Sequence, residues 1–311
     1  MEKGAKRIYG FDYLRCLAAF SVVCIHVSFT NDFLRVNKTL HNYAVPVFIL
    51  ISFFLFNSVL LRPMKEAFRK SFVKLAPPYF FWTFIYLSLG CVGSWSANKP
   101  FEVSLSDIFL GESAVQLWFL PALFLWQVIL ILFKRIETVS LLMFLAGLSL
   151  FLYLFCERNV GLDYGFIKLF LFHAPFVFIG RLVYLKREVF FGISPLLRSG
   201  LFFLTLYGIY FFDTFSLGYS LCLIVYSIVI FLFFLNGKFI ERRMIVSLSN
   251  NSFGIYLVHF GIYQCLVFAQ KIVGIDNSTV ALTMLNCIVT FMLSYGLSLT
   301  LHKWNFTSKM V

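Results

Sequence analysis

Charged residues are scarce in this sequence. They make up 13% of the 311 residues, whereas 60% are hydrophobic and the mean hydropathy is +0.88. Soluble domains usually carry about 25% charged residues, so this composition excludes an ordinary soluble protein. Apolar runs of about 20 residues, the length of a membrane-spanning helix, recur along the chain. The short alternating segments of membrane β-barrels are missing. We therefore predict a single all-α domain over residues 1–311, folded as a polytopic membrane helical bundle.

Metal and cofactor motifs are also missing. The seven cysteines are scattered, mostly inside the apolar runs, without the spacing of a disulfide framework or a metal site. The five histidines form no HxxxH or HExxH pair, and no glycine-rich nucleotide motif occurs. We find no internal repeat of the kind that many transporters contain. The sequence therefore predicts neither a metal ion nor a permanently bound cofactor.

Acidic residues are fewer than basic ones, 14 against 26, which gives a net charge of +12. Such an excess can indicate nucleic-acid binding, but its placement argues against that role. Nineteen Lys and Arg lie on one side of the predicted spans and six on the other, with Arg15 inside the first. By the positive-inside rule, both termini are cytoplasmic. The ten predicted spans are residues 13–30, 42–61, 77–95, 115–133, 139–156, 166–184, 199–215, 217–236, 249–270 and 279–301.

The first span carries ionisable residues. In the stretch DYLRCLAAFSVVCIH, Arg15 and His26 are eleven residues apart, so in a helix they lie within roughly 20° of one face and about 16 Å apart along the axis. Either residue alone has a simple explanation: Arg15 can anchor the helix at the cytoplasmic surface, and His26 can be a buried polar group that a neighbouring helix satisfies. Together they predict a functional stripe that faces one cavity.

Four further regions carry charged, polar or aromatic side chains that could serve a site. The first cytoplasmic loop, RPMKEAFRKSFVKLAPPY, is strongly basic and can bind phosphates, although such segments also contact anionic lipid head groups. His259 follows Tyr256 by about one turn in span nine, and a binding role and a buried structural role are equally consistent with it. Trp118 lies at the outer edge of span four, where interfacial tryptophans are common. His173, in span six, is more readily explained as a buried polar group.

The opening IYGFDYLRCLAAFSVVCIHVSF resembles the signature of the acyltransferase 3 family of bacterial membrane acyltransferases, in which a D-x-L-R start is followed after ten residues by His. Asp12, Leu14, Arg15 and His26 match it in place. Four later segments resemble family motifs in the same order: VPVFILISFFLF, APPYFFW, QLWFLPALF and GIYLVHF. The similarity covers essentially the whole chain, and the family layout is also ten spans with cytoplasmic ends.

Two positions depart from the family pattern. Phe53 replaces the glycine that follows the serine of the SGF motif, here Ser52, so close packing at that point is altered. The R-x-x-R before the prolines is Ser71-Phe-Val-Lys74 in this chain. Lys74 supplies charge without the planar fork of arginine.

The resemblance implies the transfer of an acyl group, commonly acetyl, from cytoplasmic acyl-CoA to a hydroxyl of a cell-surface polysaccharide or a lipid-linked glycan precursor, in the bacterial cytoplasmic (inner) membrane. Acetyl-CoA is then a co-substrate, and the glycan and membrane lipids are partners. A transporter or flippase for a glycolipid or small solute is the alternative, because a polar stripe can also form a permeation path.

The resemblance also implies roles for individual residues. His26, about 20 Å into a hydrocarbon core of about 30 Å, is the expected general base for the attacking hydroxyl. A covalent acyl-imidazole is the second possibility for it. Asp12 is expected to orient Arg15. The residues expected to bind acyl-CoA are Arg15, Asp12, Arg69, Lys70 and Lys74, and those expected to line the substrate pocket are Ser52, Trp118, Tyr256 and His259.

Overall fold

The computed structural model describes residues 7–27, 40–96, 98, 100–159, 165–212, 217–275, 279–304 and 310–311. These residues fold into helices, and no strand occurs among them, as the composition predicts. The helices are α1 (Tyr9–Val27), α3 (Ala44–Leu55), α4 (Asn57–Leu60), α5 (Met64–Ser96), α6 (Leu105–Phe109), α7 (Phe119–Phe133), α8 (Val139–Asn159), α9 (Phe166–Leu185), α10 (Arg187–Phe191), α11 (Pro195–Phe211), α12 (Leu217–Asn236), α13 (Arg243–Val273) and α14 (Val280–His302).

Seven of these helices are long and apolar enough to cross a membrane: α1, α5, α8, α9, α12, α13 and α14. The other three predicted spans overlap shorter apolar helices, α3, α7 and α11. Each of the ten predicted segments therefore contains a helix, although the first residues of span four, 115–118, form turns. The count of ten crossings and the cytoplasmic location of both ends stay predictions.

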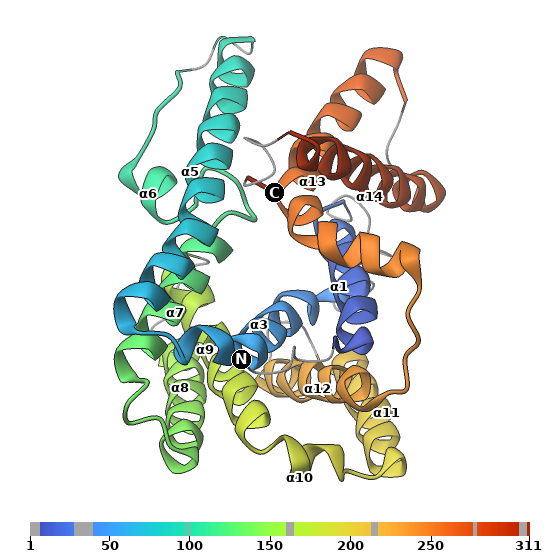
Figure 1. The fold of residues 1–311 in the computed structure, drawn as a ribbon. Helices are drawn as coiled ribbons and strands as arrows, with labels where there is room; N and C mark the ends of the chain where they lie inside the picture. Colours follow the sequence, from blue (N-terminus) through green and yellow to red (C-terminus); the bar gives the residue numbers. More distant parts are fainter. Residues whose placement is uncertain are drawn as a thin grey trace.

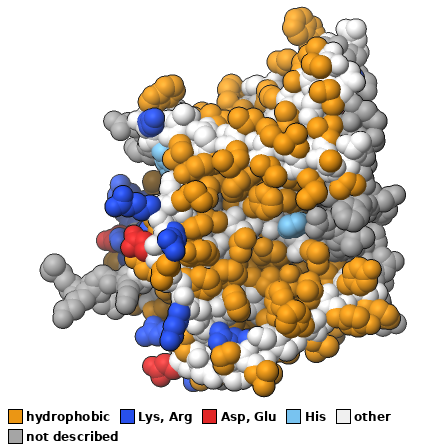
Figure 2. Space-filling view, turned by 90° about the vertical axis from the view of Figure 1, so that its right-hand side faces the viewer, with side chains coloured by type: hydrophobic (Ala, Val, Ile, Leu, Met, Phe, Trp, Pro, Cys, Tyr) orange, Lys and Arg blue, Asp and Glu red, His pale blue; other side chains and the backbone are white. Residues whose placement is uncertain are grey.

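The outer surface agrees with a membrane location. Figure 2 shows one face of the molecule, where hydrophobic side chains cover most of the surface while Lys, Arg, Asp and Glu gather toward one edge. Large apolar side chains such as Phe84, Phe203 and Phe144 are more than half exposed. A soluble protein rarely exposes apolar patches of this extent, whereas a membrane protein turns them toward lipid.

The helices form two groups joined by α3. Figure 1 shows α5 to α9 on one side and α1 with α11 to α14 on the other, with α3 between them. Helix α1 packs against α13, α3, α14 and α12, so it is surrounded by protein. Helix α3 also packs against α9, and α5 packs against α7. Because α1 packs against four other helices, its ionisable residues lie within the protein.

The basic stretch before Pro77 is helical, and its prediction as a loop was wrong. Helix α5 begins at Met64 and continues through Pro77 and Pro78. Buried residues recur at Ala67, Ser71, Leu75 and Pro78 while most of their neighbours are exposed, which is the pattern of an amphipathic helix. Membrane helices tolerate proline where surrounding groups satisfy the freed backbone. The basic residues therefore lie on the exposed sides of a rigid helix.

Helix α3 is held close to α9 at the position where this chain departs from the motif that it resembles. Phe53 is fully buried, and a Cβ on Gly180 of α9 would lie 3.3 Å from its Cβ and 2.9 Å from the carbonyl oxygen of Leu50. Contacts this short leave no room for a side chain at position 180. The glycine that allows the close approach is thus supplied by α9, and Phe53 fills the space beside it.

Candidate functional site

The N-terminal end of α1 is fixed to α13 by a buried carboxylate. Asp12, only 2% exposed, accepts two hydrogen bonds of 2.7 Å from the Arg7 guanidinium and one of 2.7 Å from the Ser249 hydroxyl. These bonds raise the pKa of Arg7 above its ordinary value. No hydrogen bond joins Asp12 to Arg15 in the described part of the chain. The hydrogen-bond partners of Asp12 are thus Arg7 and Ser249, while Asp12 and Arg15 attract each other only through their charges, so the orienting role of Asp12 stays a prediction.

Arg15 instead belongs to a group of cations. It is half-buried on α1, and the described residues provide it with no hydrogen bond or ion pair. Lys74 of α5 lies near enough for its charge and that of Arg15 to repel each other, and Lys70 adds to the repulsion at Lys74. Arg69 is exposed next to them in sequence. Like charges held together in this way repel one another, and an anion bound between them would relieve that repulsion. We call Arg15, Lys70 and Lys74 the cation cluster.

His26, at the other end of α1, faces His259 of α13. The centroids of the two imidazole rings are 5.1 Å apart and the ring planes are inclined by 34°. Helices α1 and α13 run in the same direction here, since Asp12 contacts Ser249 near their starts and Tyr263 donates a hydrogen bond to the Val27 carbonyl farther along. The two histidines lie roughly 26 Å and 24 Å along their helices, so they are at matching depth. We call them the imidazole pair.

His259 is held in one tautomer. Its Nδ1 lies 2.7 Å from the carbonyl oxygen of Tyr256, which can only accept, so Nδ1 carries the hydrogen. Nε2 therefore presents a lone pair. This atom is buried and has no hydrogen-bond partner in the described structure. A buried acceptor without a partner is costly and calls for a donor, which here has to be a substrate, water or a protonated neighbour.

Side chains from α5 and from the segment before α7 fix the turn of α13 that carries His259. The Tyr86 hydroxyl of α5 donates to the Leu257 carbonyl at 2.7 Å and accepts from the Gly261 N–H at 3.2 Å. In a regular helix these two backbone groups pair with each other, so Tyr86 bridges them. Gln116, before α7, donates from Nε2 to the same carbonyl at 3.4 Å. This turn is thus positioned by side chains from outside its own helix.

Gln116 contributes a second buried acceptor. It is 1% exposed, its backbone carbonyl accepts a hydrogen bond from the Tyr256 hydroxyl, and its side-chain Oε1 is buried without a partner. Sequence analysis missed both Gln116 and Tyr86. Gln116 is a polar residue at the start of an apolar span, which is a signal that could have drawn attention to it. Tyr86 lies within an apolar run and carries no such signal.

A layer of rings lies between the cation cluster and the imidazole pair. Tyr256, one turn before His259, has its ring centroid 5.3 Å from Phe119 and 6.4 Å from Phe48. We call Phe48, Phe119 and Tyr256 the aromatic layer. Ser52 follows Phe48 by one turn on the same face of α3, toward the cation cluster, and is half-buried. Tyr256 and Ser52 therefore lie between the cation cluster and the imidazole pair, and their role in a substrate pocket stays a prediction.

The stripe of α1 between Arg15 and His26 is covered by protein. Ala19 and Val22, which lie on it, are each only 1% exposed. Both ionisable residues are half-buried and lie on one continuous helix, as expected. The open cavity expected along the whole stripe is not found at Ala19 and Val22, because α3 and α13 pack over them.

Trp118 and His173 form a separate contact. The indole of Trp118, before α7, has its centroid 5.1 Å from the His173 ring on α9. Nδ1 of His173 lies 2.7 Å from the carbonyl oxygen of Leu169 and the residue is 5% exposed. His173 is therefore a buried, hydrogen-bonded histidine, as sequence analysis favoured. Trp118 packs beside Phe119 of the aromatic layer and does not contact the imidazole pair directly.

Among the described residues, no group of three or more His, Cys, Asp or Glu side chains is arranged to hold a metal ion. The site presents cations at one end of α1 and imidazoles at the other. A family model described as an acyltransferase domain matches residues 8–299, nearly the whole chain and every predicted site residue. Searches of the curated proteins and of the solved structures found no significant match.

Proposed function

Because the chain belongs to the acyltransferase 3 family, on a match over residues 8–299, we propose that it transfers an acetyl group from cytoplasmic acetyl-CoA to a hydroxyl of a cell-surface polysaccharide or its lipid-linked precursor. The observation that best supports this proposal is the imidazole pair, two histidines 5.1 Å apart in the interior of an apolar membrane protein. Ionisable residues at membrane depth are costly and are usually retained for function.

The cation cluster supports acyl-CoA as the donor. Coenzyme A carries several phosphates, and charge-assisted hydrogen bonds from a guanidinium or ammonium group are the strong way to bind them. Among the described residues, Asp12 makes no hydrogen bond to Arg15, and Lys70 and Lys74 present further positive charge beside it. Arg69 extends the basic surface along the same helix. In this proposal the phosphates bind at the cation cluster and the thioester end reaches toward His26.

The aromatic layer lies on the proposed route from the cation cluster to His26. Phe48, Phe119 and Tyr256 are in contact around the turn that precedes His259, and Phe119 and Tyr256 are buried. We infer that the pantetheine arm displaces Phe48 or Phe119 when the donor binds, passing Ser52. A layer that closes again would keep water from the thioester, which protects it from hydrolysis.

The proposed reaction needs one proton carrier. His26 takes the proton of the acceptor hydroxyl while its oxygen attacks the thioester carbonyl, and the tetrahedral intermediate then collapses with cleavage of the C–S bond. The imidazolium returns the proton to the leaving thiolate, giving free coenzyme A and the acyl ester. His259 Nε2, which can only accept, receives a hydrogen bond from the His26 imidazolium and stabilises it. This is the arrangement of a base supported by a second group.

A glycan suits the remaining polar atoms. Gln116 Oε1 is a buried acceptor without a partner, and a sugar presents several hydroxyl donors. In the proposal, one hydroxyl binds Gln116 while a neighbouring hydroxyl is positioned at His26.

The test uses purified protein in lipid nanodiscs with radiolabelled acetyl-CoA and surface glycans from a deletion strain. We expect label in the glycan with release of free coenzyme A, and mass spectrometry of glycans from the deletion and parent strains identifies the missing ester. Transport of the glycan or of a solute without any acylated product would instead support a transporter or flippase.

A further inference from the structure

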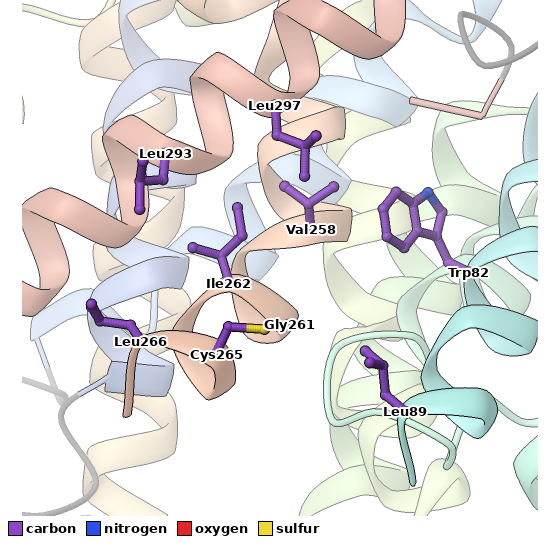
Figure 3. Close-up of a pocket in the computed structure, with 9 residues that line it drawn as sticks. All are labelled: Trp82, Leu89, Val258, Gly261, Ile262, Cys265, Leu266, Leu293 and Leu297. Carbon is purple, nitrogen blue, oxygen red and sulfur yellow. The ribbon is translucent and has the colours of Figure 1, made fainter. Parts of the chain in front are cut away.

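A lateral groove lies beside the candidate site. Figure 3 shows α5 on one side, α14 on the other and α13 as the floor between them, and the groove has a volume of about 570 Å³. This volume lies within the range of about 300–1,000 Å³ that is usual for small-molecule sites. The lining residues are Trp82, Leu89, Val258, Gly261, Ile262, Cys265, Leu266, Leu293 and Leu297.

The lining offers a ligand almost no polar groups. It contains no charged residue, and the indole Nε1 of Trp82 already donates a hydrogen bond of 2.8 Å to the Met310 carbonyl. The Gly261 N–H is bonded to Tyr86. Neither a glycan nor coenzyme A would find partners for its hydroxyls or phosphates here. The chemistry of the groove therefore selects a hydrocarbon chain.

The groove is continuous with the lipid-facing surface. Leu89, Leu293 and Leu297 are 44%, 52% and 38% exposed on helices that are long and apolar enough to cross a membrane. A chain can therefore enter sideways from the bilayer. Val258 and Leu266 are roughly 22 Å and 34 Å along α13 from its start, so the groove extends from the depth of the imidazole pair toward the far surface.

A single layer of rings separates the groove from the imidazole pair. Val258 directly precedes His259, and Trp82 has its ring centroid 6.1 Å from Tyr86. Tyr86 in turn lies 6.4 Å from Phe260, which lies 6.0 Å from His26. A hydrocarbon chain in the groove is thus close to the site but walled off from the reacting atoms. It is therefore not the acyl group in transfer.

We propose that this groove holds the hydrocarbon tail of a lipid-linked acceptor, so that the glycan attached to the tail is presented to His26 from the far side of the membrane. The inference rests on the proposed function, because it names the acceptor of that reaction as a lipid-linked glycan. The wall of Tyr86 and Phe260, the lateral opening and the depth of the groove each fit an anchored acceptor.

The experiment measures binding separately from activity. Protein in phospholipid nanodiscs is irradiated with a polyisoprenyl phosphate that carries a photoreactive group in its chain, and the crosslinked peptides are mapped by mass spectrometry. Cys265→Trp fills the groove from α13, and Cys91→Trp is its matched control, since both cysteines are exposed and only Cys265 lines the groove. Leu293→Trp and Leu285→Trp form a second pair on α14, each residue being 52% exposed and only Leu293 lining the groove.

We expect crosslinks on the groove residues of α5 and α13. They should fall about tenfold, equivalent to about 1.4 kcal/mol, in Cys265→Trp and Leu293→Trp but not in the controls. The Michaelis constant for a lipid-linked acceptor should rise in the same two variants, with that for a tail-free glycan unchanged. Crosslinks spread evenly over the lipid-facing surface, or equal competition by phosphatidylglycerol, would show that bulk lipid fills the groove and would overturn the proposal. Groove-specific crosslinks without any acyl transfer would keep the tail site while refuting the proposed reaction.

Discussion

The role of His259 gives a sharp prediction. His259→Phe keeps an aromatic ring of similar size in a fully buried position but removes the Nε2 acceptor. A hydrogen bond from a charged donor is worth about 1.5–3 kcal/mol, and in this proposal the His26 ring that donates to Nε2 becomes charged only when it takes up the hydroxyl proton. Each 1.36 kcal/mol corresponds to a factor of ten in rate, so kcat should fall about 10- to 150-fold.

The Michaelis constant for acetyl-CoA should stay unchanged in His259→Phe. The cation cluster that binds the donor lies at the other end of α1. A mutation that removes an interaction made at full strength only after proton transfer lowers kcat without weakening ground-state binding. His259→Gln, which restores an acceptor oxygen, should recover part of the rate. The assay is the initial rate of label transfer from radiolabelled acetyl-CoA in nanodiscs. His302→Phe is the control, because His302 is exposed at the end of α14, away from the site.

Two results would refute this reasoning. A wild-type kcat in folded His259→Phe would mean that the Nε2 lone pair has no part in the reaction. Equal losses in the Phe and Gln variants, with unchanged thermal unfolding, would mean that the hydrogen-bond acceptor is not what the site requires at this position.

Three further predictions concern the donor site and the packing. Arg15→Ala should raise the Michaelis constant for acetyl-CoA about 10- to 100-fold with little change in kcat, since a charge-assisted bond to phosphate is worth about 1.5–3 kcal/mol. In thermal unfolding, Gly180→Ala should destabilise the protein by about 1–3 kcal/mol, because the added methyl group overpacks against the backbone of α3. Its control, Gly147→Ala on α8, has open space around it and should be neutral in the same assay. Arg7→Ala should cost about 1–3 kcal/mol in the same assay by leaving the buried Asp12 with one partner less, and Asp12→Asn in that background should restore part of it.

Each of these has a contrary result. An unchanged donor affinity in Arg15→Ala would place the phosphates elsewhere. Equal stability of the two glycine variants would mean that α3 and α9 can separate without cost. Full stability of Arg7→Ala would show that the Arg7–Asp12 pair contributes nothing to holding α1 against α13.

The apolar pattern predicted the helices well because, in a membrane, every backbone group must be satisfied within its own helix. The first span and its two ionisable residues were predicted from spacing alone. The N-terminal extension of α5 was missed because two prolines and many charges are typical of a loop in soluble proteins. Here, buried residues at helical spacing outweigh that signal. The hydrogen bonds of Asp12 could not be predicted locally, because Ser249, more than two hundred residues away, supplies one of its partners.

The imidazole pair could not be derived from the sequence. The sequence around His259 has no residue spacing typical of a ligand-binding motif. The closeness of His259 to His26 depends on α1 and α13 running side by side in the same direction. The contributions of Tyr86 and Gln116 have the same origin, since each reaches α13 from another helix or loop. Likewise, the glycine missing beside Ser52 is compensated by Gly180 across the contact with α9. Long-range contacts of this kind leave no periodic signal.

The most direct measurement of the central claim compares acetyl transfer by the wild-type protein with transfer by His26→Ala, each purified in nanodiscs with labelled acetyl-CoA and acceptor glycan. We predict that the wild type and His302→Ala acylate the glycan at similar rates, while His26→Ala is at least about 100-fold slower and still binds acetyl-CoA. Acylation by His26→Ala at the wild-type rate would contradict the account, because the imidazole would then have no part in moving the proton.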